Sequence, residues 1–97
     1  MITIFEICGG FGGLTTSKTI DWDKLPVDQA NRLRELVYAA NFFNLPETIA
    51  YSGTARDFFQ YKITVESEGK KHTIAVDEPA VPSELKPLIQ FLKTIKL

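Results

Sequence analysis

The sequence predicts an α+β domain with the element order ββαββα, in which a four-stranded antiparallel sheet carries two helices packed on one face. Apolar and polar residues alternate over residues 59–65 and 72–77, as half-buried strands require. Apolar residues recur at helical spacing over residues 30–40 and 85–95. The chain has 97 residues, enough for one domain with its own core, so we treat residues 1–97 as a single domain.

The first two strands are expected to form a hairpin. Residues 2–8 are rich in β-branched and aromatic side chains with apolar residues on both faces, which favours a strand that is buried on both sides or central in the sheet. Over residues 14–22 every second residue is apolar or threonine, with Lys18 the exception, which predicts a second strand. The glycine-rich segment 9–13 would form the tip of this hairpin.

A helix is expected to follow the second strand. Pro26 suits the first helical position, and Asp28 lies where a helix N-terminus favours a negative charge. The helix should end near residue 41, because Asn41, Asn44 and Pro46 are typical of the end of a helix. Its apolar stripe consists of Ala30, Leu33, Leu36, Val37 and Ala40.

The second half of the chain is expected to contain a long loop and a second hairpin. Residues 44–57 show neither period, and so long a loop in a small domain is uncommon unless it is functional or disordered. The third strand should run from Phe59 to Val65, the turn should occupy residues 67–70, and the fourth strand should occupy residues 71–77.

The last helix and the topology together predict where the connections lie. Pro87 cannot stand inside a helix, so we expect a loose turn over residues 82–86 and a regular helix from about residue 87. An antiparallel ββαββα chain then brings the connections 9–13, 44–57 and 77–82 to one end of the domain.

Composition and charge argue against a nucleic-acid partner and a membrane span, and they indicate a compartment. The net charge is −1, which gives no electrostatic case for nucleic acid. No apolar stretch approaches the roughly 20 residues that a bilayer span needs. The first residues lack a basic segment, so we do not expect a signal peptide and expect a cytoplasmic protein. The single cysteine, Cys8, allows no internal disulfide and fits a reducing compartment.

The sequence gives little support for catalysis. His72 is the only histidine and falls on the inward parity of its strand, which favours a structural role over that of a general base. Cys8 has no second Cys or His at ligand or nucleophile spacing, and the carboxylates form no cluster for a metal. We therefore expect a protein that is not an enzyme, with no cofactor and no metal of its own.

The glycine-rich segment is the most informative local feature. It lacks the spacing of a phosphate-binding loop and leads into a strand rather than a helix. Its aromatic residue, Phe11, either folds back onto the core or is presented to a partner by flexible neighbours. The segment consists of Gly9, Gly10, Phe11, Gly12, Gly13 and Leu14.

Asp57 is the second candidate. It follows the long loop, precedes Phe58, and is expected at the same end of the domain as Phe11. It either caps a turn at the start of a strand beside Arg56 or offers an exposed carboxylate to a cation or metal of a partner.

The whole pattern resembles emfourin, a family of small bacterial protein inhibitors of thermolysin-like, protealysin-type zinc metalloproteases. The order and spacing of several motifs carry this resemblance over nearly the whole chain. The sequence departs from it at Gly12, where we expect alanine in relatives, and in the loop 47–56. The matching motifs are Gly9-Gly10-Phe11-x-Gly13, Leu25-Pro26, Arg32-Leu33-Arg34-Glu35-Leu36, Phe42-Phe43-x-Leu45-Pro46, Asp57-x-Phe59-x-Tyr61-x-Ile63-Thr64-Val65, His72-Thr73 and Pro82-x-Glu84-Leu85-x-Pro87-Leu88.

The resemblance implies a function and a mechanism. Such inhibitors block the protease cleft with two neighbouring loops, and the matching residues here are Asp57, as a ligand of the partner's catalytic zinc, and Phe11, as an anchor in a substrate pocket. A monomer that binds a thermolysin-like metalloprotease is expected, and the alternative is a small adaptor that binds a non-protease partner through the same end. The candidate protease-binding residues are Gly9, Gly10, Phe11, Gly12, Gly13, Leu14, Tyr51, Arg56, Asp57 and Phe58.

Overall fold

The first two strands pair in antiparallel fashion in the computed structural model, which describes residues 1–9, 15–53 and 58–95. They are β1 (Ile2–Gly9) and β2 (Thr16–Asp21). The expected second strand continued to residue 22, but Trp22 instead begins the 3-10 helix η1 (Trp22–Lys24). The Asp21 side chain ends the strand because it accepts a hydrogen bond from the backbone N–H of Asp23 at 3.0 Å.

The first helix, α1 (Val27–Ala39), follows the expected pattern. Pro26 is the N-cap residue, one position earlier than expected, and Asp28 lies in the first turn as expected. Asn41 has a φ of 53°, the left-handed conformation that commonly follows a helix end. The short 3-10 helix η2 (Phe42–Asn44) comes next.

The second hairpin lies where the alternating pattern predicts it. It consists of β4 (Phe59–Ser67) and β5 (Lys70–Asp77), which pair in antiparallel fashion. After β5 the chain forms η3 (Glu78–Ala80) and then α2 (Lys86–Thr94), whose start agrees with the expected helix from about residue 87.

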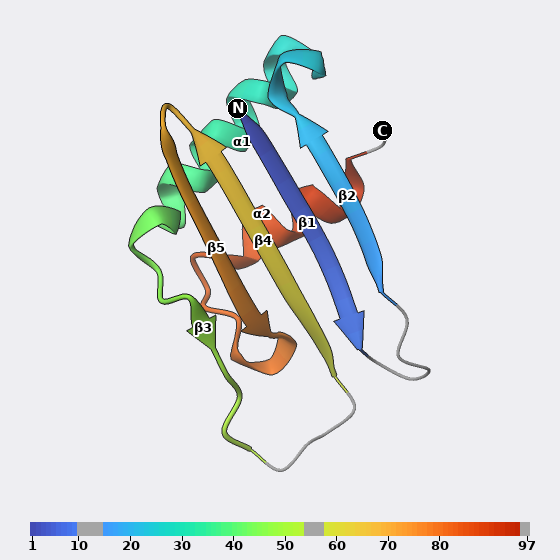
Figure 1. Ribbon diagram of the computed structural model, residues 1–97, viewed down its shortest axis with the longest axis vertical. Coiled ribbons are helices and arrows are strands. Elements are labelled where there is room, and N and C mark those ends of the chain that lie inside the picture. The colour runs from blue at the N-terminus through green and yellow to red at the C-terminus, as the bar shows by residue number, and fades with distance from the viewer. Residues whose placement is uncertain (10–14, 54–57, 96–97) are drawn as a thin grey trace.

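The sheet has five strands rather than the expected four, and it is mixed rather than antiparallel. Its order is β2-β1-β4-β5-β3, with β3 (Thr48–Ile49) parallel to β5 at the edge (Figure 1). The loop assigned to residues 44–57 therefore contains a strand. The backbone N–H of Ala75 donates to the carbonyl of Glu47 at 2.8 Å, which begins this pairing.

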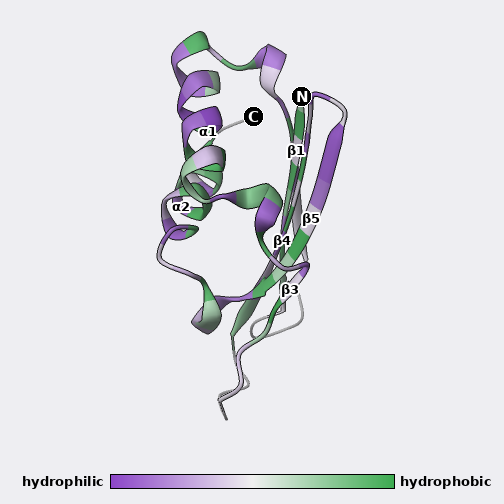
Figure 2. Ribbon diagram, turned by 90° about the vertical axis from the view of Figure 1, so that its left-hand side faces the viewer, coloured by the Kyte–Doolittle hydropathy of each residue, from purple (hydrophilic) through white to green (hydrophobic). Residues whose placement is uncertain are grey.

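Both helices lie on the same side of the sheet, as the sequence predicts (Figure 2). The core between these two layers is apolar, and its one buried indole N–H, on Trp22, donates to the hydroxyl of buried Thr3 at 2.7 Å. The buried apolar side chains of the long strands and the two helices are Phe5, Ile20, Tyr61, Ile63, Val65, Ile74, Val76, Leu33, Leu36, Val37, Leu88, Ile89 and Leu92.

Lys18 is the polar exception among the inward positions of β2, and the structure gives the reason. Its ammonium group donates to three backbone carbonyls at the end of α2, those of Leu92, Lys93 and Ile95, at 2.9 to 3.2 Å. A cation at a helix C-terminus satisfies orphan carbonyls and opposes the helix dipole favourably. Lys18 therefore joins the edge strand to α2.

Candidate binding site at the loop end of the sheet

The last residues of β1 and β5 and the first residue of β4 lie together at one end of the sheet. Gly9, the last residue of β1, lies opposite Phe59, the first residue of β4, and Gln60 lies opposite Asp77, the last residue of β5. The segments that lead into the connections 9–13, 44–57 and 77–82 therefore share one end of the molecule (Figure 1), as the topology predicts. We call this end the loop end.

The structure describes only some of the candidate residues. Gly9, Tyr51 and Phe58 are placed, and all three lie at the loop end. The other candidates lie outside the described residues, so their predicted roles stay predictions: Gly10, Phe11, Gly12, Gly13, Leu14, Arg56 and Asp57.

Gly9 is required by the backbone at the point where β1 ends. Its φ is +84°, in the region that disfavours residues with a side chain. A Cβ built on it would lie 3.4 Å from the carbonyl oxygen of Phe58, an ordinary contact distance, so the positive φ and not crowding favours glycine here. The first glycine of the segment thus serves to end β1 beside β4.

An aromatic pair joins the two sides of the connection between β3 and β4. The rings of Tyr51 and Phe58 meet edge to face, with centroids 5.7 Å apart and planes at 86°. Gly53 leaves room for the Tyr51 ring, because a Cβ at this position would overlap the ring.

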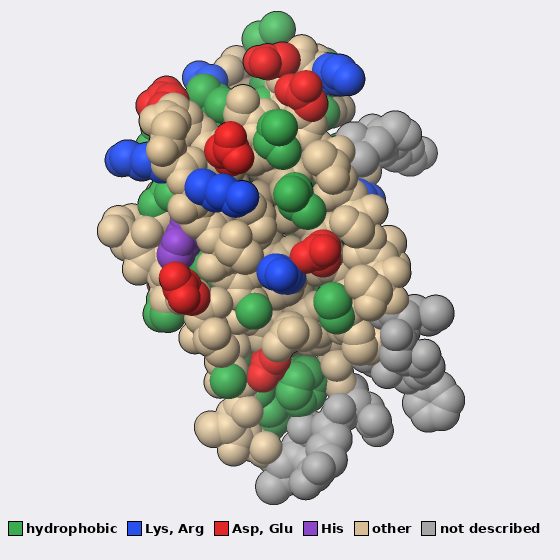
Figure 3. All heavy atoms as spheres, in the orientation of Figure 1, with side chains coloured by type: hydrophobic (Ala, Val, Ile, Leu, Met, Phe, Trp, Pro, Cys, Tyr) green, Lys and Arg blue, Asp and Glu red, His purple; other side chains and the backbone are tan. Residues whose placement is uncertain are grey.

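The same end of the molecule exposes aromatic surface. Tyr51 is 36% exposed and Phe59 is 43% exposed, although Phe59 has the same parity as the buried residues of β4. Gly9, its cross-strand partner, has no side chain to cover it. Hydrophobic side chains gather near an acidic one at this end of the sheet (Figure 3). Exposed aromatic residues of this kind are typical anchors of protein interfaces.

Asp77 is the last residue of β5, and its side chain has two specific partners. One carboxylate oxygen accepts a hydrogen bond from the backbone N–H of Tyr51 at 2.8 Å, and the other accepts one from the Gln60 side-chain amide at 3.1 Å. Asp77 therefore links β5 to β4 and to the segment after β3. No sequence pattern distinguishes it from an ordinary acid at a strand end.

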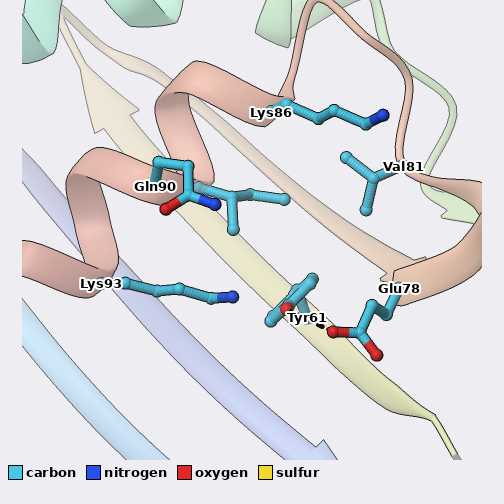
Figure 4. Close-up of a pocket in the computed structure, with 7 residues that line it drawn as sticks. Tyr61, Glu78, Val81, Lys86, Gln90 and Lys93 are labelled. Atoms are coloured by element: carbon cyan, nitrogen blue, oxygen red, sulfur yellow. Dashed lines mark hydrogen bonds between the residues drawn. The ribbon is translucent and has the colours of Figure 1, made fainter.

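A small hollow lies between α2 and the start of β4 (Figure 4). Tyr61 donates from its hydroxyl to Glu78 at 3.2 Å, and the Lys93 ammonium lies 4.9 Å from the centre of the Tyr61 ring. The hollow has a volume of about 190 Å³, below the roughly 300 Å³ at which ligand pockets begin. We therefore assign no small-molecule site to it.

The two side chains considered for catalysis are His72 and Cys8, and the contacts of His72 are structural. Nε2 of His72 lies 2.7 Å from the carbonyl oxygen of Leu45, and since a carbonyl only accepts, this nitrogen donates. The imidazole ring also meets Phe42 edge to face, so His72 anchors the segment before β3 to the sheet. Cys8 is a free, partly exposed thiol.

The described part of the chain shows neither a cluster that could bind a metal nor a helix that could span a membrane. Within residues 1–9, 15–53 and 58–95, no group of three or more His, Cys, Asp and Glu side chains could hold a metal ion. The helices described there are also too short or too polar to cross a membrane.

The fold and the site define a small α+β domain that presents loops and exposed aromatic residues at one end of its sheet. The family model named Emfourin matches residues 5–93, nearly the whole chain, and the chain therefore belongs to the emfourin family. The comparisons with curated proteins and with solved structures gave no match. Family membership suggests a role as a protease inhibitor and implies a protease as the partner.

Proposed function

We propose that this protein inhibits a thermolysin-like zinc metalloprotease by inserting two adjacent loops of the loop end into the active-site cleft. The observation that supports this most is the pairing of Gly9 with Phe59. Because these residues are partners in one ladder, the segment after Gly9 and the segment before Phe59 start from neighbouring points. One rigid element thus supports both predicted contacts with the protease.

Each loop has its own chemical role in this proposal. Asp57 offers a carboxylate oxygen to the catalytic zinc of the protease, which keeps one coordination position open for water or substrate. Phe11 fills an apolar substrate pocket, where an aromatic side chain can act as a binding hot spot. Glycines on both sides of Phe11 allow the backbone to approach the cleft closely. Tyr51 and Phe58 add aromatic surface next to these contacts.

The proposal is tested by adding the purified protein to a panel of thermolysin-like proteases. We expect inhibition that is competitive with a peptide substrate and complete near an equal molar ratio. The protein alone should hydrolyse no substrate. If every protease keeps full activity in excess protein, the inhibitor function is wrong, and a small adaptor that binds a non-protease partner through the loop end becomes the better account.

A further inference from the structure

We propose that Asp77 is a positioning residue that holds the loop between β3 and β4 in its inhibitory conformation, an inference that rests on the proposed function. Asp77 comes from β5, a strand that is adjacent to neither end of this loop in sequence. Its carboxylate nevertheless binds both sides of the loop, through the Tyr51 N–H and the Gln60 amide. We call these three residues the Asp77 bridge.

The Asp77 bridge holds the segment that follows β3 at the point where regular pairing ends. β3 contains only two residues, and its ladder to β5 stops at Ile49 opposite Val76. Asp77 follows Val76 in β5. Its side chain, rather than its backbone carbonyl, accepts the hydrogen bond from the Tyr51 N–H. The bridge thus extends the attachment of the loop beyond the end of the ladder.

The aromatic contact reinforces the bridge. Tyr51 is held through its backbone by Asp77 and through its ring by Phe58, which is adjacent to the first residue of β4. The described positions 51 and 58, on the two sides of this loop, are therefore held to each other, and position 51 is also held to β5. Holding the two ends of a loop in place before binding lowers the conformational entropy lost on binding, which raises affinity without any new contact.

The position of Asp77 favours a role in binding over a role in stability. Both of its hydrogen bonds lie at exposed sites at the edge of the molecule, where water can replace a lost partner. Its removal should loosen the loop while leaving the core between sheet and helices intact. If Asp77 served the fold alone, its removal would instead lower the stability of the protein and leave inhibition per folded molecule unchanged.

The chain offers a matched control for this proposal. Asp21 also ends a strand and also accepts a hydrogen bond from a backbone N–H, that of Asp23 at 3.0 Å. It lies at the other end of the sheet, because its partner in the ladder is Ile2, whereas Gly9 marks the loop end. Asp21→Ala thus removes a similar interaction far from the proposed contact.

The chemistry of the bridge also predicts a rescue. An asparagine at position 77 keeps one oxygen, which can accept from the Tyr51 N–H, and gains an NH₂ group. The Gln60 amide can rotate so that its oxygen accepts from this new donor. Asp77→Asn should therefore restore most of the function that Asp77→Ala removes.

The experiment measures the inhibition constant against one thermolysin-like protease and the hydrogen exchange of the Tyr51 amide. For Asp77→Ala we expect inhibition about tenfold weaker or more and faster exchange at Tyr51, as loss of a charge-assisted hydrogen bond implies. Asp77→Asn and Asp21→Ala should stay within about threefold of the unmodified protein.

The outcomes separate the positioning role from the function itself. Equal inhibition by Asp77→Ala and the unmodified protein would overturn the positioning role and leave the proposed function intact. Equal weakening by Asp77→Ala and Asp21→Ala, in proportion to their thermal stability, would also overturn it. If the unmodified protein inhibits no such protease, the proposed function fails and the positioning role fails with it.

Discussion

Gly9 and Phe59 face each other as partners at the end of the β1–β4 ladder. The two residues are far apart in the sequence, and each borders one of the two loops to which we assign protease contacts. The spacing of these loops at their base is therefore set by backbone hydrogen bonds in the centre of the sheet. Contacts supported by strands keep their geometry better than contacts on independent loops.

Asp57 is expected to dominate inhibition. Asp57→Ala removes the proposed zinc ligand, and Asp57→Asn keeps its shape but supplies a much weaker metal donor. Both variants should inhibit a thermolysin-like protease more weakly by orders of magnitude while their thermal melts match that of the unmodified protein. Potency equal to that of the unmodified protein in both variants would show that Asp57 is only a turn residue.

Substitution of Phe11 tests whether its side chain enters a pocket of the protease or packs in the core of this protein. If Phe11 enters a pocket of the protease, Phe11→Ala should weaken inhibition by about 30-fold or more and change stability little. Gly10→Val should also weaken inhibition, since a β-branched residue resists positive φ. If Phe11 instead packs in the core, Phe11→Ala should lower the free energy of unfolding by about 3–5 kcal/mol. A strongly lowered melting temperature, with inhibition per folded molecule unchanged, would assign Phe11 to the core.

Gly53 tests the aromatic pair next to it. Gly53→Ala places a methyl group where the Tyr51 ring lies, so the ring must shift, and we expect this shift to weaken its contact with Phe58. We expect inhibition to weaken about threefold to tenfold, in line with the value of an aromatic pair. The Tyr51→Ala background supplies the control, because Gly53→Ala should have no further effect there. Additive effects of the two substitutions would argue against this steric account.

Lys18 should matter for stability and leave inhibition unchanged. Lys18→Met keeps an apolar stem but removes the ammonium group that binds the last carbonyls of α2. The free energy of unfolding, measured in urea, should fall by up to about 2 kcal/mol, the upper value for a partly buried cation at a helix C-terminus. An unchanged urea midpoint would mean that water replaces these hydrogen bonds without cost.

Much of this fold follows from local sequence patterns. The alternation of Tyr61, Ile63 and Val65 predicts β4, and Asn41 marks the end of α1. The topology built from these elements predicts that the connections share one end. The pairings of Gly9 with Phe59 and of Gln60 with Asp77 confirm it for the described segments that flank them.

The remaining features depend on contacts between distant residues. β3 has only two residues, too few to show a period, and its parallel pairing with β5 arises from the course of the whole chain. Lys18 interrupts the pattern of β2 because its partners lie at the end of α2. The Asp77 bridge likewise joins residues that no local pattern connects. The predicted roles of Phe11 and Asp57 stay predictions.

The most direct test of the proposed mechanism asks whether the protein and a small hydroxamate that ligates the catalytic zinc exclude each other. Calorimetry would measure binding of this protein to a thermolysin-like protease with the hydroxamate absent and then at saturation. The proposed mechanism predicts tight binding at a ratio of one to one in the free protease, and strongly weakened binding when the hydroxamate occupies the zinc. Equal affinity in both titrations would contradict insertion of the loops into the active-site cleft.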